Sequence, residues 1–146
     1  MPVSKVEFHT QAQNRLQYAC RLLRKAAASG AQVLVTADEE TLMQFDQFLW
    51  TFSGTDFVPH CFHNAPMQVL ANTPIVLTPT PPVHATQEIL LNLGSDVPAG
   101  FEQFARIIEI VSEDVNDKQQ ARSRWKQYAS SGCELSSRDL QAAAPR

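Results

Sequence analysis

Glycine is scarce in this sequence, which has five glycines among 146 residues. Standard phosphate-binding loops depend on glycine, because only a residue without a side chain lets the backbone amides approach a phosphate closely. The turn expected after the first strand, residues 9–13, reads His-Thr-Gln-Ala-Gln and contains none. Neither a dinucleotide-binding fingerprint nor a P-loop occurs elsewhere in the chain. We therefore expect no nucleotide bound by a standard motif.

Long apolar runs are missing as well, since no stretch approaches the roughly 18 residues that a membrane-spanning helix requires. The N-terminus, MPVSKVEFHT, lacks the basic segment and apolar stretch of a secretion signal. Cys20, Cys61 and Cys133 are odd in number and widely spaced, which favours reduced thiols over a disulfide framework. These absences predict a cytoplasmic protein without a membrane segment.

Motifs of catalysis and metal binding are also lacking. The segment His60-Cys61-Phe62-His63 contains metal-ligand types, but its spacing matches no structural zinc pattern. A nucleophilic Cys61 would need a histidine beside it in space, and adjacency in sequence does not provide that geometry. No Gly-x-Ser-x-Gly nucleophile elbow occurs. We expect a protein that is not an enzyme, with no catalytic residue, no metal site and no cofactor.

Acidic residues are absent from two segments of a chain whose formal net charge is −3. Residues 11–37 and 118–131 contain no Asp or Glu, yet they hold eight of the twelve Lys and Arg residues. These cations are Arg15, Arg21, Arg24, Lys25, Lys118, Arg122, Arg124 and Lys126. Two basic helices in an acidic protein indicate a local anionic partner. Two solvated helix faces explain the charges equally well.

The N-terminal third has the pattern of a βαβ unit. Apolar residues alternate over residues 3–8, which predicts a strand, and recur at helical spacing over residues 11–29. Thr10 is the expected N-cap of that helix, and Gly30 its end. The apolar run at residues 32–36 predicts a second strand, buried on both faces and paired parallel with the first.

The rest of the chain continues the alternation of helices and strands. The expected elements are a helix at 38–51 capped by Asp38, a turn at 53–56, an extended piece at 56–60, strands at 74–78, 88–93 and 107–111, a short helix at 98–104, and a last helix from about Asn116 to Ser131 that Gly132 ends. We predict one three-layer, Rossmann-like α/β domain with a mostly parallel sheet over residues 1–141, and a frayed tail at 142–146.

The predicted helix at 38–51 has more apolar surface than one sheet face can cover. One stripe at helical spacing consists of Leu42, Phe45, Leu49 and Phe52. Met43 and Trp50 lie about 80–100° away around the helix axis, on a second stripe. A helix packed on one side needs only one stripe. The second stripe predicts cover by a loop or by another protein.

The last predicted helix combines a cationic strip with an aromatic residue. Lys118, Arg122 and Lys126 form the strip, and Trp125 lies at its boundary with an apolar side. That core-facing side consists of Ala121, Tyr128, Ala129 and Gly132. The combination suits an acidic peptide with a hydrophobic terminus. An edge-of-core Trp125 on a solvated helix is the alternative, and stacking of single-stranded DNA on Trp125 is a third.

Several blocks of the sequence, in order and spacing, resemble the chi family of DNA polymerase III subunits. These blocks are 46–50 (DQFLW), 57–60 (FVPH), 89–93 (ILLNL), 97–98 (VP), 101–104 (FEQF), 109–111 (EIV) and 122–128 (RSRWKQY), and they are followed by Gly132. The similarity extends from Val3 to Leu140. It implies a Rossmann-like fold without nucleotide binding and a non-catalytic adaptor of the clamp loader.

The resemblance also implies two protein partners, with DNA contacted only indirectly and no membrane contact. The first is the acidic C-terminal tail of single-stranded DNA-binding protein, for which the matching positions are Arg122, Trp125, Lys126, Val111 and Ser137. Trp125 stands where the family usually has Tyr, and Cys133 stands where an aromatic residue is common. The second partner is the psi subunit, whose matching surface contains Met43, Trp50, Phe57, Val58 and Pro59.

Two other functions remain open at this point. A small Rossmann-like nucleotide-binding enzyme with a non-standard loop would bind nucleotides without the motifs sought above. A direct single-stranded DNA binder would bind oligonucleotides without a protein partner.

Overall fold

The computed structural model describes residues 4–51 and 58–141, which form a seven-stranded sheet flanked by helices. The strands are β1 (Lys5–Ala12), β2 (Val33–Thr36), β3 (His60–Phe62), β4 (Ile75–Thr78), β5 (Ile89–Asn92), β6 (Arg106–Ser112) and β7 (Glu134–Asp139). The helices are α1 (Arg15–Ala28), α2 (Glu39–Thr51), α3 (Met67–Asn72), α4 (Val115–Ser130) and the 3₁₀ turn η1 (Phe101–Gln103).

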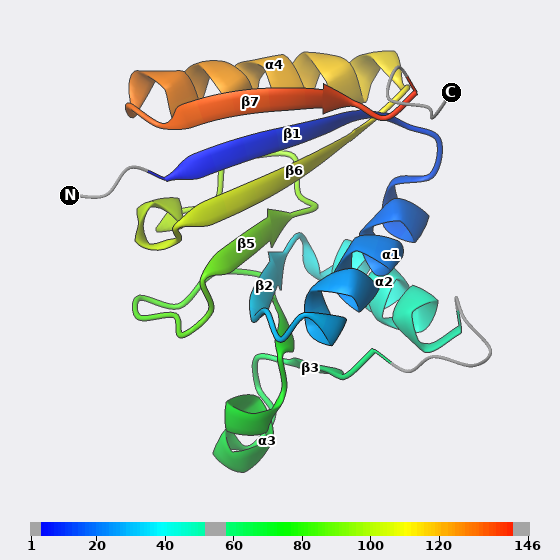
Figure 1. Cartoon of the computed structure of the whole chain (residues 1–146), viewed down its shortest axis with the longest axis vertical. Helices are drawn as coiled ribbons and strands as arrows, with labels where there is room; N and C mark the ends of the chain where they lie inside the picture. Colours follow the sequence, from blue (N-terminus) through cyan, green and yellow to red (C-terminus); the bar gives the residue numbers. More distant parts are fainter. Residues whose placement is uncertain (1–3, 52–57, 142–146) are drawn as a thin grey trace.

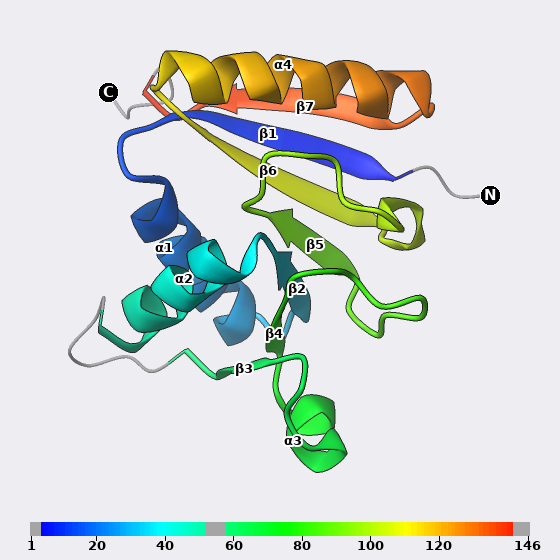
Figure 2. The same cartoon turned by 180° about the vertical axis from the view of Figure 1, so that it is seen from behind.

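The helices cover both faces of the sheet. Helices α1 and α2 pack together on one face, and α4 lies along β7 on the other (Figure 1; Figure 2 shows the reverse side). Each face of the sheet has its own hydrophobic core. Strand β6 contributes side chains to both cores, because successive side chains of a strand point to opposite faces. Ile108 and Ile110 pack in the α1 and α2 core, whereas Ile107 and Val111 pack in the α4 core. The predicted three-layer α/β fold is confirmed.

All neighbouring strands of the sheet are parallel, in the order β3-β4-β2-β5-β6-β1-β7. The predicted pairing of the first two strands is wrong, because β5 and β6 lie between β1 and β2. A crossover helix requires that the strands it joins run parallel, but it does not limit how many strands it passes. Strand β1 therefore lies between β6 and β7, near one edge of the sheet.

The starts of two helices differ from the predicted ones. Thr10 lies within β1, which continues to Ala12, and the N-cap of α1 is Asn14, whose side chain accepts a hydrogen bond from the Gln17 amide at 3.0 Å. Asp114, rather than Asn116, caps α4 by accepting from the Asp117 amide at 3.0 Å. In both helices an Asn or Asp side chain just before the first turn satisfies an amide that has no partner within the helix.

Two elements have no counterpart in the prediction. Strand β7 reads Glu-Leu-Ser-Ser-Arg-Asp and is mostly exposed, because it is an edge strand whose backbone bonds to β1 determine its position. Helix α3 has six residues and no buried side chain. Neither segment has the apolar periodicity by which secondary structure is recognised in a sequence.

Helix α2 agrees with its prediction. Asp38 accepts hydrogen bonds from the Thr41 amide at 3.1 Å and the Thr41 hydroxyl at 2.6 Å, which confirms it as the cap. The stripe of Leu42, Phe45 and Leu49 is buried in the core. Phe52, the turn predicted at 53–56 and the first two residues of the extended piece at 56–60 lie outside the described residues.

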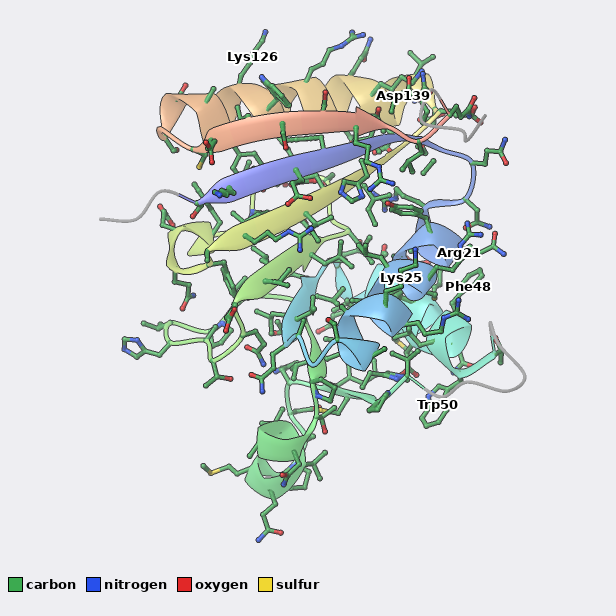
Figure 3. All side chains as sticks on the ribbon, viewed as in Figure 1. Arg21, Lys25, Phe48, Trp50, Lys126 and Asp139 are labelled. Carbon is green, nitrogen blue, oxygen red and sulfur yellow. The ribbon has the colours of Figure 1, made fainter. Side chains whose placement is uncertain are left out.

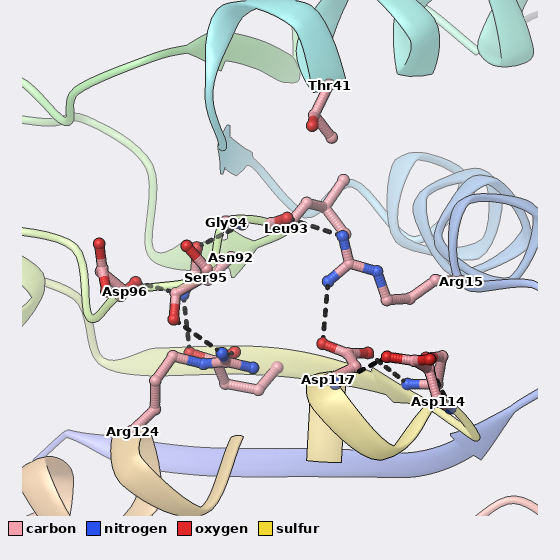
Figure 4. A network of polar contacts seen from close by, with 12 residues as sticks. Arg15, Thr41, Asn92, Leu93, Gly94, Ser95, Asp96, Asp114, Asp117 and Arg124 are labelled. Atoms are coloured by element: carbon pink, nitrogen blue, oxygen red, sulfur yellow. Dashed lines mark hydrogen bonds and ion pairs between the residues drawn. The ribbon is translucent and has the colours of Figure 1, made fainter. Parts of the chain in front are cut away.

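A buried ion pair attaches α4 to the sheet. The Arg124 guanidinium donates from Nε to Glu109 Oε1 at 2.9 Å, and both side chains are almost fully buried. Glu109 Oε2 accepts from the Tyr128 hydroxyl at 2.7 Å and from the Asn92 amide at 2.9 Å. Arg124 Nη1 also donates to the Ser95 carbonyl at 2.9 Å (Figure 4). Helix α4 is thereby joined to β5, β6 and the loop after β5.

Burial changes the pKa values of Glu109 and Tyr128 in this network. Burial raises the pKa of Glu109, and the positive charge of Arg124 with the hydrogen bonds from Asn92 and Tyr128 opposes that rise. Burial and the neighbouring Glu109 carboxylate raise the pKa of Tyr128, so its hydroxyl remains protonated and donates. The orientation of α4 on the sheet thus depends on buried polar groups that bond to one another, although Arg124 Nη2 has no hydrogen-bond partner among the described residues.

Breaking the ion pair should strongly destabilise the fold. Arg124→Ala leaves the Glu109 carboxylate buried without its counter-charge, so we expect the free energy of unfolding to fall by about 3–5 kcal/mol. Urea unfolding followed by circular dichroism measures this loss. The matched control is Arg122→Ala, on the exposed side of the same helix, which should change stability by about 0.5 kcal/mol or less. Equal effects of the two variants would contradict a structural role specific to Arg124.

Candidate functional site

A cavity of about 540 Å³ lies between α4 and the strands β1, β6 and β7. The residues that line it are Phe8, Thr10, Gln11, Val111, Lys118, Ala121, Arg122, Trp125, Lys126 and Ser137. We call this space the α4 cavity. All five positions that the family resemblance assigns to tail binding belong to this lining, although they come from β6, α4 and β7.

The floor of the α4 cavity is apolar and aromatic. The rings of Phe8 and Trp125 pack at a centroid distance of 5.2 Å with an angle of 53° between their planes. Val111 and Ala121 are buried beside them. Trp125 is half-buried, so one part of its indole rests on the core while another part faces the cavity. An apolar group that enters this cavity finds a preformed surface.

The rim of the α4 cavity is cationic. Lys118, Arg122 and Lys126 follow one another at intervals of four residues, which places them in one row along α4. Figure 3 shows Lys126 projecting outward from the helix. No acidic side chain of the described residues lines the cavity. The site therefore presents positive charge around an apolar floor, and its charged groups remain hydrated.

The structure corrects two positions on the predicted face of α4. Ala121 and Tyr128 are buried as predicted, whereas Ala129 and Gly132 are exposed. Arg124 is buried in their place, because its guanidinium bonds to Glu109 beneath the helix. A helical wheel based on hydrophobicity assigns an arginine to the surface and cannot anticipate a buried carboxylate on a neighbouring strand.

Sequence reasoning missed Phe8, Thr10 and Gln11 as lining residues. Phe8 and Thr10 are two residues apart in β1, so they face the same side of the sheet. That alternation could have identified them once β1 was known to neighbour β7. Lys118 was recognised as part of the cationic strip, and its spacing of four residues from Arg122 is the signal that includes it in the site.

A second exposed surface lies on α2. Met43 is 65% exposed and Trp50 is 54% exposed, which confirms that the core does not cover the second stripe. Phe48, which the prediction did not include, is 37% exposed. Figure 3 shows Phe48 and Trp50 near the same end of the helix layer. Phe48 lies about 140° around the helix axis from Met43, whereas Trp50 lies on the same side as Met43. We call Met43 and Trp50 the α2 surface.

His60, at the start of β3, holds Trp50 in position. The Trp50 ring packs against the ring of His60 at a centroid distance of 5.1 Å. His60 Nε2 lies 2.9 Å from Asp46 Oδ1, and His60 Nδ1 lies 2.7 Å from the Val58 carbonyl oxygen. The exposed indole is therefore presented on a hydrogen-bonded support.

The residues after α2 contribute unequally to this surface. Pro59 is partly exposed, and Phe57 lies outside the described residues. The prediction of Val58 as a contact residue is corrected, because its side chain is 1% exposed and packs in the α1 and α2 core. An alternating backbone points Val58 inward, so it supports the surface without being part of it.

The carboxyl ends of β2, β4 and β5 border a crevice of about 320 Å³. Open parallel sheets often bind nucleotides at such a place. Here Asp38 and Asp96 line the crevice, and hydrogen bonds from Thr41 lower the pKa of Asp38. The Asn92 side chain is occupied with Gly94 and Glu109. Carboxylates where phosphates would lie give no support to the nucleotide-binding alternative.

Metal binding and membrane insertion find no support in the part of the chain that the structure describes. No group of three or more His, Cys, Asp or Glu side chains is placed to hold a metal ion there. Within the same residues, no helix combines the length and the apolar character needed to cross a bilayer.

The fold and the α4 cavity define an α/β protein whose clearest surface feature is a cationic cleft with an aromatic floor. Comparison with known proteins gives the family. The family model for "DNA polymerase III chi subunit, HolC" matches residues 3–136. The chain therefore belongs to the DNA polymerase III chi subunit family, which gives it an accessory role in DNA replication.

Individual relatives agree with this assignment. The chain is 35% identical to the DNA polymerase III subunit chi of Pseudomonas aeruginosa, over 83% of each chain. It is 30% identical to the subunit of the same name from Haemophilus influenzae, over 85% of this chain and 86% of that one. It is 26% identical to the Escherichia coli subunit, over 82% of this chain and 81% of that one.

The contrast between Val58 and Met43 is open to direct measurement. Val58→Ala removes buried methyl groups, so we expect it to lower the free energy of unfolding by about 1–2.5 kcal/mol. Met43→Ala alters an exposed position and should change it by about 0.5 kcal/mol or less. Thermal and urea unfolding of the two variants test this. A Val58→Ala variant as stable as the wild type would contradict the placement of Val58 in the core.

Proposed function

We propose that this protein is a non-catalytic adaptor of the clamp loader, which binds the acidic C-terminal tail of single-stranded DNA-binding protein in the α4 cavity. The observation that supports the proposal best is the convergence of Val111, Arg122, Trp125, Lys126 and Ser137 on one cavity. Those residues lie on three different elements, and the family resemblance had assigned them before the fold was known. The proposed role at the replication fork corresponds to a location in the cytoplasm.

The chemistry of the cavity matches that of an acidic tail with a terminal aromatic residue. The apolar floor at Phe8 and Trp125 can receive the aromatic ring. The rim cations Lys118, Arg122 and Lys126 can pair with the tail carboxylates and with the terminal carboxylate. Arginine can bind a carboxylate through two parallel hydrogen bonds, which adds orientation to attraction. Because Arg122 and Lys126 are exposed, salt should weaken the binding.

Trp125 occupies a position where the family usually has tyrosine, and this alters one feature of the floor. The indole offers a larger apolar surface than a phenol ring, and it has an N–H donor in place of a hydroxyl. Its packing on Phe8 keeps the aromatic contact available. Cys133, which stands where an aromatic is common, packs against the α4 core and does not line the cavity.

We further propose that the α2 surface binds the psi subunit. Large apolar side chains exposed together are costly in water and typically mark an interface. Met43 and Trp50 lie on the same side of α2, and α2 packs on the opposite face of the sheet from α4 (Figure 1). The two partners would therefore contact separate faces, and the protein would link them through its sheet.

Tail binding can be tested with a synthetic acidic peptide ending in Ile-Pro-Phe. Arg122→Ala should weaken the binding by about 1–3 kcal/mol, because it removes charge-assisted hydrogen bonds at the cavity rim. Isothermal titration calorimetry at low and high salt measures the loss. Lys5→Ala, which removes an exposed cation at the other end of β1, is the matched control and should bind as the wild type does. Full affinity in Arg122→Ala would reject the site.

Psi binding can be tested by co-purification. Trp50→Ala removes the largest exposed apolar side chain of the α2 surface, so we expect the retained psi subunit to fall at least about tenfold, as for a typical hot-spot residue. Met67→Ala is the control, since Met67 is 85% exposed but lies on α3. The tail peptide should bind both variants normally. Retention of psi by Trp50→Ala would exclude this surface.

A further inference from the structure

Another cavity, of about 740 Å³, lies against α1 on the opposite face of β1 and β7 from the α4 cavity. Its lining residues are Gln11, Ala12, Gln13, Asn14, Gln17, Tyr18, Arg21, Leu22, Arg24, Lys25, Arg138, Leu140 and Gln141. We call this space the α1 groove. Four cations line it, and no acidic side chain of the described residues does. Figure 3 shows Arg21 and Lys25 on the outer side of α1.

The α1 groove adjoins the α4 cavity at the end of β1. Gln11 lines both spaces. On β7, Ser137 lines the α4 cavity and the next residue, Arg138, lines the α1 groove, as expected from the alternation of side chains along a strand. The two spaces therefore lie on opposite faces of the same two strands and share one boundary residue.

The backbone at this boundary is unusual. Gln11 has a φ of 62°, in the left-handed region that a residue with a side chain seldom adopts. The pairing of β1 with β6 shifts register between His9 and Ala12. The Gln11 carbonyl accepts a hydrogen bond from the Gln141 side chain at 3.2 Å. The chain thus bulges where the two spaces meet, and its conformation is held by a residue that lines the α1 groove.

We propose that the α1 groove binds acidic residues that precede the terminal segment of the same tail. One peptide would then place its aromatic end in the α4 cavity, pass Gln11, and continue into the α1 groove. This inference rests on the proposed function and adds a second subsite to it. An extended chain advances about 3.3 Å per residue, so each residue added before the aromatic end extends the reach of the peptide past Gln11 by that length.

The lining of the α1 groove fits a peptide better than a nucleic acid. Single-stranded DNA needs aromatic faces on which its bases can stack. Tyr18 is the aromatic residue of this lining, and its hydroxyl lies 2.6 Å from His9 Nδ1, which ties the ring to the sheet. Gln13 and Gln17 offer amides that can bond to a peptide backbone. Positive charge with amide groups is the chemistry that recognises an acidic peptide.

The test compares two peptides and three proteins. The long peptide has about 12 residues, with acidic residues before its Ile-Pro-Phe end, and the short peptide has about four residues with the same end. The variant is Arg21→Glu/Arg138→Glu, which reverses the charge on two sides of the α1 groove. Lys5→Glu, a charge reversal outside both spaces, is the control. Unchanged circular dichroism and melting temperature establish that each variant is folded.

We expect the wild type to bind the long peptide more tightly than the short one. The double variant should bind the long peptide about threefold to tenfold more weakly, as expected for the loss of two exposed charge interactions, and the short peptide unchanged. The Lys5→Glu control should resemble the wild type with both peptides. High salt should reduce the difference between the peptides.

Each other outcome has a distinct meaning. If the double variant binds both peptides as the wild type does, the second subsite is rejected and the proposed function stands. If the wild type binds neither peptide, the proposed function fails and the inference fails with it. If the wild type binds an oligothymidylate that the double variant does not bind, the α1 groove is a nucleic-acid surface and the inference is overturned.

Discussion

The Arg124–Glu109 ion pair is the interaction on which the α4 cavity depends. It joins α4 to β6 beneath the helix, and Asn92 and Tyr128 complete the bonds of the carboxylate. A charged pair in a core is costly unless its hydrogen bonds are satisfied, and here the Glu109 carboxylate accepts from three donors. The result is a single orientation of α4. That orientation places Trp125 over Phe8 and leaves Arg122 and Lys126 at the surface.

The same network divides the basic residues of the chain by role. Arg124 faces inward, and Arg15 on α1 donates to the Leu93 carbonyl at 2.8 Å and lies near Asp117 (Figure 4). These two cations support the fold. Arg21, Arg138 and the row along α4 remain at the surface. The cations of the two basic segments therefore serve two purposes: some bond within the fold, and others form a charged surface.

Sequence patterns predicted the elements with strong apolar periodicity. They failed where contacts between distant segments determine the position of a strand or the direction of a side chain. The stripes of α2 and the cationic row of α4 follow from spacing within one helix, so they were predicted correctly. The place of β1 beside β7, and hence the roles of Phe8 and Gln11 in the cavity, depends on pairing between distant segments. Strand β7 is polar and its backbone bonds to β1 hold it in place, which no pattern of side chains reveals. The inward turn of Arg124 required knowledge of Glu109 on another element.

The opposite placement of the α2 surface and the α4 cavity affects how a weak contact can be used. A rigid parallel sheet separates them, so occupation of one does not sterically block the other. A protein held at one face keeps its other face near a second binding partner, which raises the effective concentration for the second contact without any new interaction. Under the proposed function, the tail contact could therefore be modest and reversible, while an assembly linked through both faces would persist through repeated release and rebinding.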